Sequence, residues 1–158
     1  MNWKIVLGLL ALVGSAFALP LGPYGIDYDQ IDGAIWTPIA KNDGIGADNL
    51  TTTAYAGVLL APDGWALIII NDFNREIGLD SYDCWGMMGN VTEFIPVENL
   101  QTAVANDGQN WRAVWSLDGG WEDGILYGTD AVAVTTGGWD REEVLAFLGS
   151  LKVEKTSP

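Results

Sequence analysis

The chain has 158 residues, which is enough for one domain with its own hydrophobic core. It carries 21 acidic against 7 basic side chains, so its net charge of −14 excludes nucleic acid and anionic membrane surfaces as partners. The absence of histidine removes the commonest general base and zinc ligand, and a single cysteine excludes an intrachain disulfide.

Residues 1–18 have the three-part pattern of a cleavable signal peptide. Lys4 supplies a basic start, residues 5–13 form an apolar run, and the small residues Ala16 and Ala18 fit a signal peptidase. The apolar run is much shorter than the roughly 20 residues that a membrane-spanning helix needs. We therefore expect cleavage after Ala18, no stable membrane insertion of the mature protein, and secretion or display on the extracellular face of the cell envelope.

After the signal peptide, the pattern predicts one folded unit with irregular ends. Residues 19–33 are rich in Gly, Pro and Asp, which favours an irregular lead-in. Residues 34–153 are expected to form a single domain, and residues 154–158 a polar tail. Within the domain, residues 34–40 suit a short strand and residues 42–49 suit a loop.

A β-hairpin is the clearest element in the middle of the chain. Two apolar runs, residues 52–60 and 65–70, are joined by Ala61-Pro62-Asp63-Gly64. The proline fixes the first torsion of the turn and the glycine accepts a positive φ. Residues 71–81 are polar and predict a loop.

The following segment predicts one helix and three strands. Apolar residues three and four apart indicate a helix over residues 97–105. Residues 110–117 alternate between two faces, as a strand does. Two more strands are expected at residues 125–127 and 131–136.

A helix over residues 141–151 has the strongest start signal in the chain. Asp140 is placed as the N-cap, Glu143 follows three residues later, and Trp139 is placed to pack on Val144 as a hydrophobic staple. Its apolar stripe must lie against a sheet. The predicted fold class is therefore α+β, a mostly antiparallel sheet with a C-terminal helix packed on it.

The densest acidic cluster lies in the lead-in and is formed by Asp27, Asp29 and Asp32. Crowded carboxylates in a flexible loop suit calcium, so a calcium site is one interpretation. The spacing departs from the standard calcium loop, so a solvated acidic turn is the competing interpretation.

Two tryptophans, Trp85 and Trp121, lie in Gly-rich surroundings that would leave their rings free to bind a ligand. Exposed rings of this kind stack on sugars. Next to Trp121, Glu122 and Asp123 are the nearest approach to the carboxylate pair of a glycoside hydrolase. Adjacent residues in a turn point apart, so we assign no catalytic residue.

Two further features depend on export. Asn49 and Asn90 each begin a triplet that matches the N-glycosylation pattern. Cys84 is surrounded by Trp and Met, so we expect a buried small apolar residue; a free thiol and a disulfide to another chain are the alternatives.

Several runs of the last third resemble the ending of small uncharacterised secreted proteins of methanogenic archaea. They are Trp111-Arg112-Ala113-Val114-Trp115, Trp139-Asp140-Arg141-Glu142-Glu143 and Ser150-Leu151-Lys152-Val153-Glu154. The turn Ala61-Pro62-Asp63-Gly64-Trp65 is similar to one in PsbP-like domains, which have an antiparallel sheet with flanking helices. The resemblance implies an α+β fold and no catalytic residue.

Three functions fit these observations. The first is a non-enzymatic secreted or cell-surface domain, an envelope component or a binding module for a protein or a glycan. The second is a carbohydrate-binding or carboxylate-dependent glycan-active protein, which exposed Trp rings beside two acids would favour. The third is a structural protein stabilised by calcium, the one cofactor that the sequence suggests.

Overall fold

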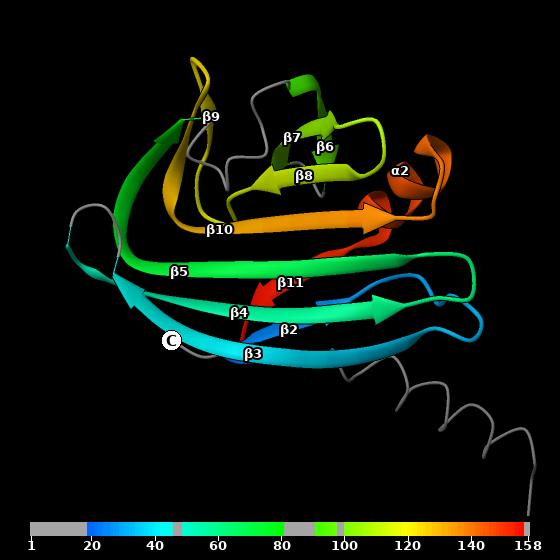
Figure 1. The fold of residues 1–158 in the computed structure, drawn as a ribbon. Helices are drawn as coiled ribbons and strands as arrows, with labels where there is room; N and C mark the ends of the chain where they lie inside the picture. The colour runs from blue at the N-terminus through cyan, green and yellow to red at the C-terminus, as the bar shows by residue number, and fades with distance from the viewer. Residues whose placement is uncertain (1–18, 46–48, 81–90, 98–99, 157–158) are drawn as a thin grey trace, which may run out of the picture.

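The computed structural model describes residues 19–45, 49–80, 91–97 and 100–156. Their strands form two antiparallel sheets, one of eight strands and one of three (Figure 1). The elements are β1 (Leu19–Leu21), β2 (Tyr24–Asp27), β3 (Ile35–Ile45), β4 (Thr51–Leu60), β5 (Trp65–Asp80), β6 (Val91–Val97), β7 (Leu100–Asn106), β8 (Trp111–Trp115), β9 (Gly120–Glu122), β10 (Ile125–Gly137), α2 (Arg141–Ser150) and β11 (Lys152–Lys155). The predicted signal peptide, Cys84, Trp85 and Asn90 lie outside the described residues.

The large sheet has the strand order β3-β4-β5-β10-β8-β7-β6, and β9 pairs with β10. The small sheet has the order β1-β2-β11. The main core lies between the two sheets and α2, and it includes Tyr24, Ile68, Trp115, Val134 and Leu148. Burying each such aliphatic side chain stabilises the fold by about 1.5–3 kcal/mol, so this layer holds the two sheets together.

The opposite face of the large sheet has a second, smaller core. Strands β5 and β10 contain 16 and 13 residues, and their paired ends curl away from the rest of the sheet together with β9 (Figure 1). The pairing of β10 with β5 shifts between Gly128 and Asp130, and such a bulge bends a strand. The curled end contributes Leu126, Leu79 and Trp121 to this core, so β7, β8 and β10 are covered on both faces.

The predicted α+β class is wrong, because the described part of the chain is mostly antiparallel β: 67% of its residues are strand and 8% are helix. The helix predicted over residues 97–105 is instead strand β7, paired with β6 and β8. Val104 faces the main core, whereas Ala103 and Ala105 face the smaller one. A strand that is apolar on both faces loses its period of two, and its residues can then match a helical spacing by chance.

Four segments predicted to be irregular also contain strand residues. The lead-in, residues 19–33, contains β1 and β2, and the tail contains the end of β11. The loop predicted over residues 71–81 is instead a continuation of β5, which runs to Asp80 with alternate half-buried residues. Strand β3 likewise continues through residues 42–45. In the lead-in and in residues 42–45 and 71–80 the turn-forming residues are Gly, Asn, Asp or Pro, and pairing with neighbouring strands overrides their local preference.

The hairpin and the C-terminal helix are confirmed. Ala61 N donates to Gly64 O over 2.8 Å to close the turn between β4 and β5. At the start of α2, Glu143 N donates to Asp140 Oδ1 over 2.9 Å, and Asp140 N donates to Glu143 Oε2 over 2.8 Å. This is a complete capping box, so short-range signals were sufficient here.

Candidate functional site

A tyrosine platform lies on the curled end of the large sheet. Tyr127 of β10 pairs with Gly78 of β5 on one side and with Gly120 of β9 on the other. Both cross-strand neighbours lack side chains, and the ring of Tyr127 lies over Gly78, where an added Cβ would be 3.2 Å from the ring. Tyr127 as a whole is 41% exposed, so its ring can offer a flat apolar surface to a ligand.

Two carboxylates flank the platform and complete a hollow. The hollow has a volume of about 420 Å³ and is lined by Glu76, Gly120, Trp121, Glu122 and Tyr127. Glu76 and Glu122 are exposed, and each oxygen of an ionised carboxylate accepts hydrogen bonds. The platform hollow, defined by these five residues, therefore combines an aromatic surface with hydrogen-bond acceptors at its rim.

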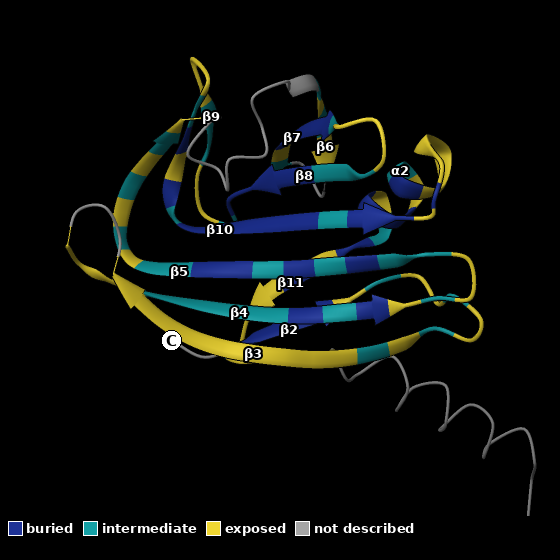
Figure 2. Cartoon of the chain, in the orientation of Figure 1, coloured by how far each residue is buried: buried dark blue, intermediate teal, exposed yellow. Residues whose placement is uncertain are grey.

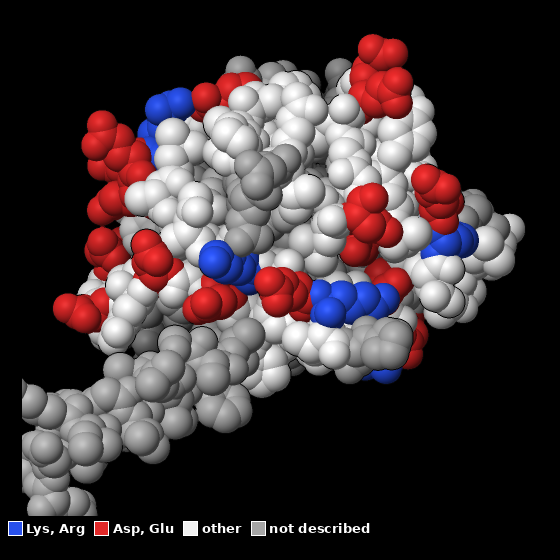
Figure 3. All heavy atoms as spheres, turned by 180° about the vertical axis from the view of Figure 1, so that it is seen from behind, with Lys and Arg blue, Asp and Glu red and all other residues white. Residues whose placement is uncertain are grey.

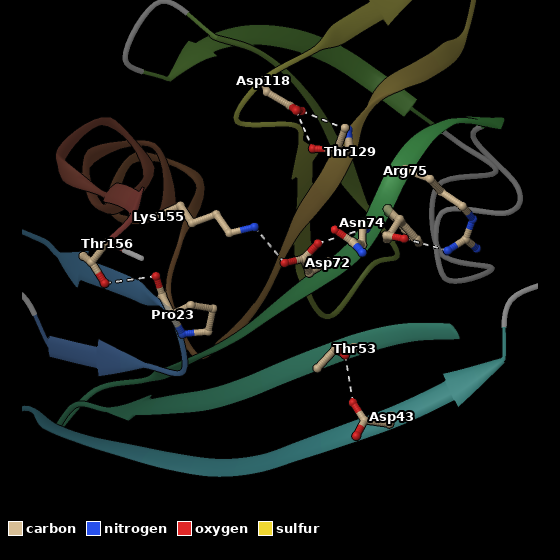
Figure 4. A network of polar contacts seen from close by, with 11 residues as sticks. Pro23, Asp43, Thr53, Asp72, Asn74, Arg75, Asp118, Thr129, Lys155 and Thr156 are labelled. Carbon is tan, nitrogen blue, oxygen red and sulfur yellow. Dashed lines mark hydrogen bonds and ion pairs between the residues drawn. The ribbon is translucent and has the colours of Figure 1, made fainter. Parts of the chain in front are cut away.

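The loop after β8 packs on the part of β10 that carries Tyr127, next to the bulge where β5 has extra residues opposite β10. Gly119 packs so closely on the backbone of Tyr127 that an added Cβ would lie 1.8 Å from the Tyr127 carbonyl oxygen. Asp118 secures the other side of the bulge, because its carboxylate accepts from the backbone N–H of Thr129 over 2.9 Å and from the Thr129 hydroxyl (Figure 4). The loop after β8 is thereby held against the strand that carries the tyrosine.

A buried carboxyl group lies beneath this bulge. Asp130 is 7% exposed, and its Oδ1 accepts from Leu117 N over 2.8 Å. Burial raises the pKa of Asp130, and the nearby charges of Asp118 and Asp72 raise it further. The pKa of Asp118 is lowered instead, because hydrogen bonds from Thr129 and Ser116 outweigh its partial burial.

Ser116 connects these two carboxyl groups. Its Oγ lies 3.0 Å from Asp118 Oδ1 and 3.1 Å from Asp130 Oδ1, and it accepts from Gly119 N over 3.2 Å. A hydroxyl has one proton, so it can donate to only one of the two carboxylates at a time. Protonated Asp130 would donate to Ser116 while Ser116 donates to Asp118, which matches the opposite pKa shifts.

Trp121, predicted to be a free binding residue, lies at the edge of the hollow. Its ring is half-buried against the smaller core, and its Nε1 donates to Val114 O over 3.1 Å. It also meets the ring of Phe94 edge-on, with 5.8 Å between ring centroids. Trp121 therefore supports the platform, while Tyr127 presents the open ring.

Glu122 and Asp123 do not form a catalytic pair. Glu122 ends β9 and lines the platform hollow, whereas Asp123 begins the two-residue turn to β10. Asp123 and Gly124 both have positive φ, 49° and 78°, as the tightest hairpin turns require. Asp123 is thus explained by the turn. Sequence reasoning missed Tyr127 and Glu76, because only the pairing of β5, β10 and β9 brings them together.

The predicted calcium residues are spread along the chain from β2 into the segment that follows it. Asp27 ends β2, Asp29 donates its backbone N–H to Ser150 Oγ over 3.1 Å, and Asp32 is exposed in a turn. Asp29 lines a second hollow of about 250 Å³ beside α2, together with Asp63 and Glu143. Within the described ranges, no three acidic or cysteine side chains are arranged to hold a metal ion.

The surface is acidic on the face seen from behind (Figure 3), where basic side chains lie beside acidic ones. Of the two predicted glycosylation residues, Asn49 is the one that the structure describes. It is exposed, has a φ of 62° and lies just before β4.

Comparison with known proteins gave no match to a family model, a curated protein or a solved structure. Among the described helical residues, no segment has the length and apolarity to cross a membrane.

Proposed function

We propose that this protein is a non-enzymatic, extracytoplasmic saccharide-binding domain, and that the platform hollow is its ligand site. The observation that supports the proposal best is the open ring of Tyr127 between two glycines, with a carboxylate on each side. The pyranose ring has one apolar face and a rim of hydroxyls, which matches an aromatic surface surrounded by acceptors. The signal-peptide pattern of residues 1–18 supports a location outside the cytoplasm.

The charge of the site favours one class of sugar. Glu76 and Glu122 accept hydrogen bonds from hydroxyl or amide N–H groups, whereas a uronic acid or a sulfated sugar would be repelled by them and by the net charge of −14. Neutral and N-acetylated oligosaccharides are therefore the proposed ligands. One platform with an open hollow predicts weak binding.

A binding role fits the site better than hydrolysis does. Glycoside hydrolysis needs a carboxyl group with a raised pKa at the scissile bond, beside an ionised one. Asp130 has a raised pKa, but it is buried beneath the bulge and does not line the platform hollow.

Calorimetric titration with neutral, N-acetylated and uronic-acid oligosaccharides tests the proposal. We expect binding of a neutral or N-acetylated member, lost in Tyr127→Ala and in Gly120→Val. Gly120 does not have a positive φ and an added Cβ there meets nothing within 4 Å, so Gly120→Val blocks the platform without straining the fold. Leu60→Ala, an exposed apolar change on another strand, is the matched control. Binding that survives both platform variants, or no binding at all, would contradict the proposal.

A further inference from the structure

The exposed edge strand of the large sheet has a sequence that is complementary to itself. Strand β3 pairs only with β4 among the described strands, and every residue from Thr37 to Ile45 is exposed (Figure 2). Its last seven residues are Ile39-Ala40-Lys41-Asn42-Asp43-Gly44-Ile45. Read from either end, this run is isoleucine, a small residue, a charge, Asn42, the opposite charge, a small residue and isoleucine.

We propose that β3 is a self-association edge, at which two copies of the protein pair antiparallel about a two-fold axis through Asn42. In this register Lys41 lies opposite Asp43 of the second copy, and Ile39 lies opposite Ile45. The glycine and alanine positions then face each other. Each pair occurs twice, so the contact is the same on both copies, as a two-fold interface requires.

Each of these side chains is free to make the contact. Ile39 and Ile45 are 57% and 76% exposed, so a second copy could bury apolar surface at both ends of the proposed edge. Within the described part of the chain, Lys41 has no ion-pair partner. Asp43 Oδ1 accepts from Thr53 Oγ1 over 2.8 Å, which leaves Oδ2 available (Figure 4). Opposite charges directly across an antiparallel pair stabilise it, as do paired β-branched side chains.

The sequence of β3 also sets where the proposed pairing between two copies ends. Pro38 has no N–H to donate, so the new ladder ends at Ile39. The pairing of β3 with β4 shifts between Pro38 and Ala40, so Ile39 is the bulged residue and regular pairing with β4 covers Ala40 to Ile45 of the proposed edge. Lysine, proline and bulges also protect edge strands from association. A protected edge would leave the protein monomeric, so the two explanations differ in the oligomeric state they predict.

Sedimentation velocity of the exported protein at increasing concentration tests the proposal. The wild type is expected to form a dimer. Lys41→Asp and Asp43→Lys should each weaken the dimer at least about tenfold, because like charges replace both opposite-charge pairs. The first variant raises the net negative charge and the second lowers it, so simple self-repulsion would shift them in opposite directions. A monomeric wild type, or single variants that dimerise as the wild type does, overturns the proposal.

Mixing the two variants tests the register itself. Lys41→Asp has two aspartates on its edge and Asp43→Lys has two lysines, so the two variants should form a heterodimer that is tighter than the homodimer of either one. In a Cys84→Ser background, Asn42→Cys should form an intermolecular disulfide on the axis. Gly44→Cys should not, because its copies would be about 13 Å apart. A mixture that stays monomeric, or cross-linking by Gly44→Cys in preference to Asn42→Cys, rules out this register.

Discussion

The Nζ atom of Lys155 lies 2.9 Å from Oδ2 of Asp72, which joins the last strand of the small sheet to β5 of the large one (Figure 4). This hydrogen bond is the main cause that raises the pKa of Lys155. Asp72 also pairs in register with Asp130, so two carboxyl groups share one face of the sheet. The lysine therefore offsets negative charge at the point where the two sheets meet.

Replacement of Lys155 by Met should lower the free energy of unfolding by about 1 kcal/mol, because the lysine is 41% exposed and solvent screens the pair. Urea unfolding measures this loss. A double-mutant cycle with Asp72→Asn should show that the two effects are coupled.

The stabilisation by Lys155 should also depend on pH. Because the pKa of Lys155 is raised on folding, this stabilisation is present below the ordinary lysine pKa and is lost as the pH rises through the folded value. Additive effects of the two changes would show that the contact contributes nothing.

Replacement of Asp130 by Asn should remove the contribution that Asp130 makes to the pH dependence of the unfolding free energy at acid pH. The pKa of Asp130 is raised on folding, so its protonated form is favoured in the native state, and ionisation destabilises the wild type as the pH rises through the folded value. The amide oxygen of the substituted side chain can still accept from Leu117 N. We expect the variant to gain stability relative to the wild type as the pH rises from about 3 to 7. Unfolding free energies at several pH values measure the difference, and a constant difference would contradict the pKa assignment.

Asp118→Asn should have the opposite pH dependence. The pKa of Asp118 is lowered on folding, so its carboxylate stabilises the native state above its unfolded pKa, and this stabilisation is lost as the pH falls. The change weakens the contacts with Thr129 and should cost about 1–2 kcal/mol at neutral pH. Tyr127 should then be held less firmly, so saccharide affinity should fall with stability. A loss of affinity without any loss of stability would mean that Asp118 acts on the ligand directly.

Trp121→Ala should destabilise the protein by about 2–3 kcal/mol, because the change removes half-buried aromatic surface and the hydrogen bond to Val114 O. Trp121→Phe retains the packing and should recover most of the loss. Thermal and urea unfolding measure both variants. Unchanged stability in Trp121→Ala would instead identify a free ring of the kind the sequence suggested.

Calcium and magnesium should raise the melting temperature equally at equal ionic strength, because both relieve repulsion among 21 acidic side chains and Asp27, Asp29 and Asp32 do not converge. Thermal melts with each ion make the comparison. A saturable rise that is specific to calcium and absent from Asp29→Asn would place a calcium site in this segment.

The sequence alone determined the elements whose signals are local. The turn Ala61–Gly64 and the capping box of Asp140 and Glu143 involve residues within a few positions of each other, so their side chains specify the structure wherever they occur. Residues 19–27, 71–80 and 100–106 could not be assigned in this way, because a strand also needs a partner to pair with, and two of the partners, β10 for β5 and β11 for β2, are distant in the sequence.

Only the tertiary structure decided where the proposed sites lie. Tyr127, Gly78 and Gly120 are brought together by cross-strand pairing of β10 with β5 and β9. The edge position of β3 likewise depends on which strands pair with β4. Register is a property of two segments together, since a shift of one residue would move each side chain to the other face. A single run of sequence therefore does not specify these sites, although it contains the residues that form them.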